Sequence, residues 1–145
     1  MSLSNNAENL LCNLIFRNSG IPNVGNAGGL LPSSADGSLH TSLHTADPGE
    51  TGSQSTNEIS YTGYLRPAAT RGSGWTVTSS GVFNAGQIDF PICVGGSGSA
   101  SFFGLGTVAS GAGTLLFSSS FNSPLTIVSG ITSFIPVSGM NIIGD

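Results

Sequence analysis

From residue 38 onward, short alternating or apolar runs are separated by turns rich in glycine, serine and proline. The turn signals recur roughly every 8–12 residues, which is typical of antiparallel β-sandwiches and barrels. No repeat of fixed period is evident, which argues against a propeller or a solenoid. We therefore predict a mainly β fold, a single antiparallel β-sandwich of the jelly-roll or immunoglobulin-like kind. The predicted strands are residues 38–44, 59–64, 75–78, 82–83, 88–90, 99–108, 114–117, 121–128, 131–135 and 140–143.

One helix is predicted before the strands, over residues 4–17. Asn5 with Glu8 resembles a capping box, and Gly20 followed by Pro22 gives a stop signal. Residues 18–37 are predicted to be an extended surface loop because they are rich in glycine and proline. We expect residues 1–145 to form one domain. The helix has one apolar face at helical spacing, made by Ala7, Leu10, Leu11, Leu14 and Ile15.

Charge is scarce. Only 7% of the residues are charged, against roughly 25% in an ordinary globular domain. There is no lysine, and after Arg71 only Asp89 and Asp145 carry charge. Because mixed surface charge normally keeps a monomer soluble, this favours a surface covered by copies of the chain or by a partner. The alternative is a soluble domain coated with hydroxyl and amide groups.

The sequence also argues against nucleic acid, a membrane and a metal as partners of the chain. A net charge of −4 with three arginines gives no basic patch for nucleic acid. No apolar run approaches the ~20 residues of a membrane-spanning helix. The start of the chain lacks the pattern of a signal peptide, so synthesis in the host cytoplasm is expected. Cys12 and Cys93 are predicted to be buried free thiols, not ligands of a metal.

The two histidines are candidate metal ligands or catalytic bases. His40 and His44 lie on a predicted strand, where residues four apart are separated by about 13 Å and cannot share one metal. We expect both to be polar, partly exposed side chains. No Gly-x-Ser-x-Gly motif is present, and the acids stand outside any catalytic pattern. The sequence therefore predicts no enzyme, no metal and no cofactor. A small lytic hydrolase that uses a histidine is a distant alternative.

The segment 39–67 holds both histidines, both tyrosines and several of the few charged residues. It contains a turn at Asp47-Pro48-Gly49. We predict that this segment forms a polar interface and that one of its two tyrosines faces outward. The predicted interface residues are His44, Asp47, Glu50, Tyr61, Tyr64 and Arg66.

Several landmarks then occur in a recognisable order. They are Ala-Glu-Asn-Leu-Leu at 7–11, Ser-Leu-His-Thr-Ala-Asp-Pro-Gly-Glu at 42–50, Tyr-Thr-Gly-Tyr-Leu-Arg at 61–66, Phe-Asn-Ala-Gly-Gln-Ile-Asp-Phe-Pro at 83–91, Phe-Phe-Gly-Leu-Gly at 102–106, Gly-Thr-Leu-Leu-Phe at 113–117 and Met-Asn-Ile-Ile at 140–143. Their order resembles a family of small tailed-bacteriophage virion proteins, which comprises head decoration (cement) and tail-fibre-like β-sandwich proteins. The resemblance covers most of the chain.

The resemblance implies a structural role in the virion. The favoured expectation is a capsid decoration protein on the outer head surface, which would bind the major capsid protein and copies of itself as a trimer. The alternative is a tail or tail-fibre component that contacts the host, with a host glycan as its ligand.

Overall fold

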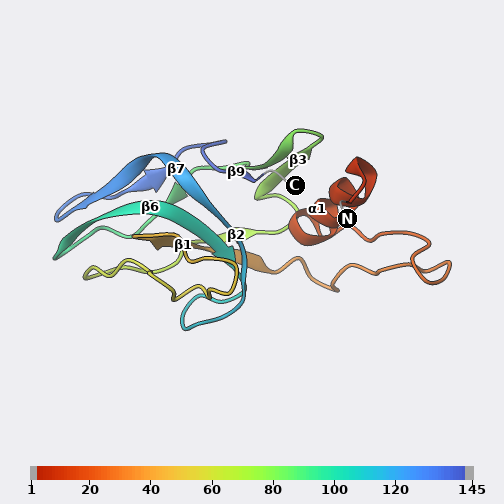
Figure 1. The fold of residues 1–145 in the computed structure, drawn as a ribbon, viewed down its shortest axis with the longest axis horizontal. Helices are drawn as coiled ribbons and strands as arrows, with labels where there is room; N and C mark the ends of the chain where they lie inside the picture. Colours follow the sequence, from red (N-terminus) through yellow and green to blue (C-terminus); the bar gives the residue numbers. More distant parts are fainter. Residues whose placement is uncertain (1–2, 143–145) are drawn as a thin grey trace. The chain divides into compact units, whose positions relative to one another are not determined.

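The computed structural model describes residues 3–142. The pairings β1–β6, β6–β7, β3–β4, β4–β9 and β5–β8 are all antiparallel. The predicted mainly β class with an N-terminal helix is thereby confirmed (Figure 1). The elements are α1 (Asn5–Arg17), β1 (Ser38–His44), β2 (Ala68–Thr70), β3 (Trp75–Thr78), β4 (Gly81–Asn84), β5 (Ile88–Asp89), β6 (Ser97–Gly106), β7 (Leu115–Val128), β8 (Phe134–Ile135) and β9 (Asn141–Ile142).

The chain divides into two compact units. The first, the helix unit, comprises Met1–Ser38, Thr70–Gln87 and Pro136–Asp145; the second, the sheet unit, comprises Leu39–Ala69 and Ile88–Ile135. The helix unit contains α1 and the three-stranded sheet β3-β4-β9. The sheet unit contains most of the four-stranded sheet β2-β1-β6-β7 and the two-stranded ribbon β5-β8. The single domain expected over residues 1–145 stays a prediction.

Helix α1 covers nearly the predicted range, but the residues that cap its two ends are not the predicted ones. Ser4, not Asn5, is the N-cap, and its hydroxyl accepts a hydrogen bond from the Ala7 N–H. The helix ends at Arg17, and the residue that caps it is Asn18, in a left-handed conformation, instead of Gly20. Asparagine tolerates this conformation better than other non-glycine residues, so it replaces the expected glycine.

An aromatic contact and an arginine help to fasten α1 to the rest of the helix unit. Phe16 is fully buried and packs edge-on against Trp75 of β3, with ring centroids 5.1 Å apart. Arg71 donates to the carbonyls of Leu14 and Ile15, both at 2.6 Å. These carbonyls lie in the last turn of α1, where carbonyl groups lack helical partners. The residues predicted for the apolar helix face are half-buried, and Phe16 is the anchor that the prediction omitted.

The sheet unit is dominated by its two longest strands, β6 and β7, which run side by side (Figure 1). Two predicted strands, 114–117 and 121–128, are one strand, β7. The register shifts between Ala100 and Phe102 of β6, where β7 advances from Leu125 to Ser120. This irregularity accommodates Pro124, which an edge strand tolerates. Both the sheet and the ribbon contain buried apolar residues, among them Leu43, Phe103, Ile88 and Ile135, which agrees with a sandwich-like unit.

The predicted strand at 59–64 is wrong. The segment makes only two bridges nearby, His44 with Glu58 and Thr62 with Gly95. Gly63 has φ +101°, and a Cβ there would lie 2.8 Å from the Ile92 carbonyl oxygen. The chain turns at this point, because the Tyr64 N–H bonds to the Tyr61 carbonyl. Strand-like alternation therefore arises in an ordered loop.

Two of the other predicted strands are shorter in the structure than in the prediction. The predicted strands at 131–135 and 140–143 shorten to β8 and β9, and residue 143 lies outside the described residues. Residues 18–37 form no helix or strand, apart from one bridge between Ile21 and Leu30. In the described part of the chain, no helix is long and apolar enough to span a membrane.

Candidate functional site

The segment 39–67 forms a buried polar network in the sheet unit. The Arg66 guanidinium binds the Glu58 carboxylate through two bonds, Nε to Oε1 at 2.6 Å and Nη2 to Oε2 at 2.7 Å. The Tyr64 hydroxyl donates to Glu58 Oε1 at 2.9 Å and accepts from the Leu43 N–H at 3.0 Å. The Arg66 side chain is only 3% exposed and that of Glu58 17%. These residues therefore satisfy one another inside the unit.

This arrangement shifts the pKa values of Tyr64 and Arg66. Burial raises the pKa of Tyr64, and the adjoining Glu58 carboxylate adds to the increase because it disfavours a second negative charge. The hydrogen bonds to Glu58 raise the pKa of Arg66 against the opposing effect of burial. The tyrosine therefore stays protonated and the arginine stays charged, so neither is poised to transfer a proton near neutral pH.

His44 was expected to be partly exposed, and this is wrong. The side chain is fully buried, because the 53–58 loop and β6 cover the end of β1. Its Nδ1 lies 2.7 Å from the Thr56 carbonyl, which requires a proton on Nδ1. Nε2, 2.8 Å from the Ser42 hydroxyl, then accepts from that hydroxyl. Burial lowers the pKa of His44, so the neutral ring is favoured.

His40 and His44 do not form a shared site. It is half-buried, four residues earlier on β1, and pairs with Gly106 where His44 pairs with Phe102. Among residues 3–142, no group of three or more His, Cys, Asp or Glu side chains is arranged to hold a metal ion.

The predicted interface residues fall into two groups. Asp47 and Glu50 are exposed, and Asp47 Oδ1 accepts from the Gly49 N–H in the expected turn. Tyr61 is buried, its hydroxyl donates to the Pro91 carbonyl, and burial raises its pKa. The buried group also contains His44 and Arg66, while Tyr64 is half-buried. The structure thus brings Tyr64 and Arg66 together around Glu58 and leaves the two acids at the surface.

Gln54 is a structural residue that the sequence did not reveal. Its side chain is fully buried, and its Oε1 accepts from the Val108 N–H at 3.0 Å. Its backbone N–H bonds to the Ala112 carbonyl. A Cβ at Gly106 would collide with Gln54 Cδ, so this glycine makes room for the amide. A glutamine in a polar loop gives no sequence signal for such a role.

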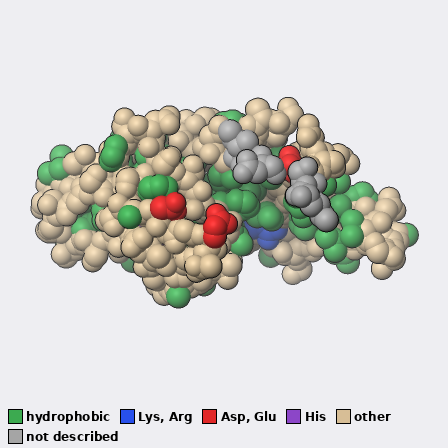
Figure 2. Space-filling model, viewed as in Figure 1, with side chains coloured by type: hydrophobic (Ala, Val, Ile, Leu, Met, Phe, Trp, Pro, Cys, Tyr) green, Lys and Arg blue, Asp and Glu red, His purple; other side chains and the backbone are tan. Residues whose placement is uncertain are grey.

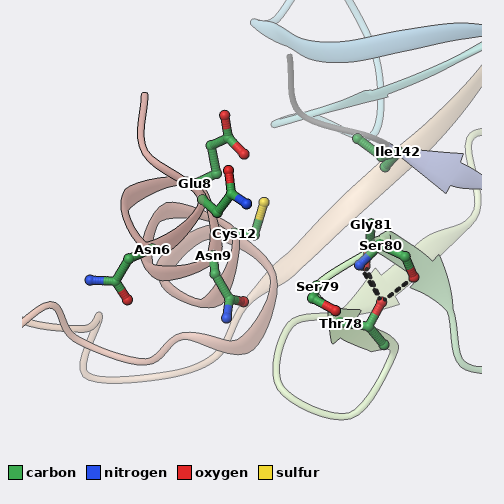
Figure 3. A pocket seen from close by; sticks show the side chains of 10 residues that line it. Asn6, Glu8, Asn9, Cys12, Thr78, Ser79, Ser80, Gly81 and Ile142 are labelled. Atoms are coloured by element: carbon green, nitrogen blue, oxygen red, sulfur yellow. Dashed lines mark hydrogen bonds between the residues drawn. The ribbon is translucent and has the colours of Figure 1, made fainter. Parts of the chain in front are cut away.

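The helix unit contains a groove. It has a volume of about 400 Å³ and lies between α1 and the β3–β4 turn (Figure 3). Its lining is mostly neutral and polar: Asn5, Asn6, Glu8, Asn9, Cys12, Thr78, Ser79, Ser80, Gly81 and Ile142. Positions 5, 8, 9 and 12 share one helix face, which explains how a single helix supplies half of the lining. None of the groove residues is among the predicted site residues, although the spacing of Asn5 and Asn9 indicates a polar face on the helix.

The groove contains a thiol beside a carboxylate. Cys12 is half-buried and free. Burial raises the pKa of Cys12, and the nearby Glu8 carboxylate raises it further. The thiol is therefore protonated and weakly nucleophilic near neutral pH. Cys93, in the sheet unit, is buried, with its sulfur donating to the Gly95 carbonyl.

All three arginines are engaged within the protein. Arg17 donates to the Trp75 carbonyl at 2.9 Å, Arg66 binds Glu58, and Arg71 binds the end of α1. Since the chain has no lysine, little basic surface remains for an anionic ligand. On the face drawn in Figure 2, charged side chains form isolated spots among neutral polar atoms.

No curated protein matches the chain. A family model described as "Podophage GP4 fiber I protein gp80" matches residues 2–142, which is nearly the whole chain. This confirms the resemblance to bacteriophage virion proteins and agrees with the tail-fibre alternative better than with head decoration. The chain belongs to the family of podophage GP4 fiber I protein gp80 and is a structural component of a phage virion.

Proposed function

We propose that the protein is a tail-fibre subunit that contacts the host surface and acts by binding, without catalysis. The family match over residues 2–142 carries this proposal, because the family is named for a fibre protein. The buried, neutral His44 and the internally paired Glu58 and Arg66 support a role without catalysis. A hydrolase would require these groups to reach a substrate.

Copies of the same chain are the proposed neighbours in the fibre. The two strands of the β5-β8 ribbon stay paired beyond their ends, through bonds such as Phe90 N–H to the Ser133 carbonyl. We call the whole of residues 88–94 and 128–135 the apolar ribbon. Large apolar side chains along it are 44–62% exposed: Ile92, Val94, Val128, Ile131 and Phe134. Exposed apolar clusters of this kind are typical of interaction surfaces. Self-association, with the trimer expected from the sequence as one possible state, would cover them.

Head decoration, with the major capsid protein as partner, is the competing assignment. Phage that lack this protein distinguish the two. We expect such particles to keep intact, DNA-filled heads and to lose adsorption to host cells, and adding back purified protein should restore adsorption. Particles that adsorb normally but release DNA from unstable heads would contradict the fibre proposal and support decoration.

A further inference from the structure

We propose that the groove between α1 and the β3–β4 turn binds a neutral or amine-bearing glycan of the host surface. This inference rests on the proposed fibre function and assigns a ligand class to one site. The groove volume of about 400 Å³ lies within the ~300–1,000 Å³ range of ligand pockets. It is large enough for a saccharide unit, and its walls come from elements of one compact unit.

The lining offers the hydrogen-bonding groups that sugar hydroxyls require. Amide and hydroxyl side chains both donate and accept, as sugar hydroxyls do. Within the described residues, the side chains of Asn5, Asn6, Glu8 and Ser79 have no protein hydrogen-bond partner, so they are available to a ligand. Thr78 and Ser80 instead bond to each other at 3.0 Å and fix the shape of the turn. Figure 3 shows this turn facing the helix, with Cys12 on the side toward it.

The charged groups that line the groove determine which class of glycan it can bind. No lysine or arginine lines the groove, and the arginines are engaged elsewhere in the protein. Acidic sugars and phosphorylated glycans would therefore meet the Glu8 carboxylate without a compensating cation. A neutral sugar can donate two hydroxyl bonds to Glu8, and an amino sugar can pair its ammonium with it. The groove thus favours neutral and amine-bearing ligands.

The affinity of one groove should be low. The described lining includes no aromatic side chain on which a sugar ring could stack, so hydrogen bonds and the apolar side chain of Ile142 supply the attraction. We expect millimolar dissociation constants for single sugars. A fibre that presents several copies would gain avidity from simultaneous attachment, which makes weak sites effective on a cell surface.

Cys12 provides a direct reporter in the unmodified protein. It lines the groove, whereas Cys93 is buried. Excess iodoacetamide should alkylate Cys12 slowly, because its thiol is mostly protonated, and the rate of this slow reaction in the native protein should report groove occupancy. The probes are N-acetylglucosamine and galactose (neutral), glucosamine (amine-bearing) and galacturonic acid (acidic), with betaine as the osmolality control. We expect the neutral and amine-bearing sugars to slow alkylation at millimolar concentration, and galacturonic acid and betaine to leave its rate unchanged.

Paired variants test the binding residues. Asn5→Ala with Ser79→Ala removes two groove side chains that have no bond to the rest of the protein, so the fold should be retained. The sugar concentration needed for half-protection should rise about tenfold, as the loss of two ordinary hydrogen bonds implies. The matched control, Asn122→Ala with Ser123→Ala, changes two exposed residues of β7 outside the groove and should match the wild type.

Two outcomes of the alkylation assay would overturn the inference: galacturonic acid protecting Cys12 more strongly than the neutral sugars, or the groove variant being protected as well as the wild type. A third outcome concerns treated host cells: the inference fails if protease treatment of the cells abolishes binding of the protein and periodate treatment does not. The last would identify a peptide ligand. If deletion phage fail to adsorb while groove-variant phage adsorb normally, the groove assignment fails and the fibre function stands. Normal adsorption of the deletion phage would contradict the fibre function itself.

Discussion

At the residue scale, His44, Glu58 and Arg66 lie where they stabilise the interior, whereas Asp47 and Glu50 stay at the surface. The spacing of His40 and His44 on β1 correctly predicted that they would lie apart. The burial of His44 could not be predicted, because it depends on a loop and a strand distant in sequence. The pairing of Glu58 with Arg66 was equally inaccessible, since the eight-residue separation corresponds to no regular element.

The Glu58–Arg66 pair should dominate the stability of the sheet unit. Glu58→Gln leaves a nearly buried guanidinium without its counter-charge and should lower the free energy of unfolding by about 3–5 kcal/mol. Urea denaturation followed by circular dichroism measures the change. The control Glu50→Gln alters an exposed acid and should change stability by less than about 0.5 kcal/mol. Equal effects of the two substitutions would refute the assignment, and Glu58→Gln with Arg66→Met should recover stability.

His44 should make the protein less stable in mild acid. Because its pKa is lowered in the folded state from the ordinary value of 6.5, the unfolded chain binds the proton more readily. Stability is therefore complete above about pH 6.5 and falls as the pH drops toward the lower folded pKa. His44→Asn keeps a donor for the Thr56 carbonyl but cannot titrate. Denaturation between about pH 7.5 and 5.5 should show a smaller loss in this variant, and parallel curves would exclude His44 as the cause.

At the element scale, local signals predicted elements better than their pairing. Helix α1 was placed within a residue because its apolar spacing and caps are local features. The strand predicted at 59–64 failed because alternation alone cannot show whether a neighbouring strand exists. The two strands predicted at 114–117 and 121–128 are one strand, β7, because both segments pair with β6 on either side of Pro124. Alternation alone could not show this pairing either.

Arg71 should be the residue that fastens α1 to its unit. Arg71→Lys replaces a planar fork that bonds the Leu14 and Ile15 carbonyls with a point charge. We expect a loss of about 2–4 kcal/mol, measured by denaturation with fluorescence of Trp75, the sole tryptophan. Arg17→Lys is the control, because Arg17 makes a single bond to a carbonyl. Similar losses in both variants would contradict this role for Arg71.

At the scale of the whole molecule, low charge and exposed apolar side chains suit a protein that works in an assembly. The sequence already indicated this from the uncharged stretch after Asp89. It could not locate the surfaces: the apolar ribbon and the polar groove each combine segments distant along the chain. The interface predicted in segment 39–67 remains a prediction, with Asp47 and Glu50 as its exposed residues.

Self-association should depend on the apolar ribbon. Val94→Ser with Ile131→Ser reduces its exposed apolar surface and should lower the average mass in sedimentation velocity at a concentration where the wild type self-associates. Val24→Ser with Leu31→Ser changes exposed apolar residues of the helix unit and should leave the mass unchanged. The proposed interface would be wrong if the ribbon variant kept the wild-type mass.

The location of the protein on the particle tests the central claim most directly. Electron microscopy of intact virions labelled with gold-conjugated antibody against this chain would show that location. A fibre subunit predicts gold confined to the tail, at projecting fibres. Gold distributed over the head surface, with none at the tail, would contradict the fibre assignment.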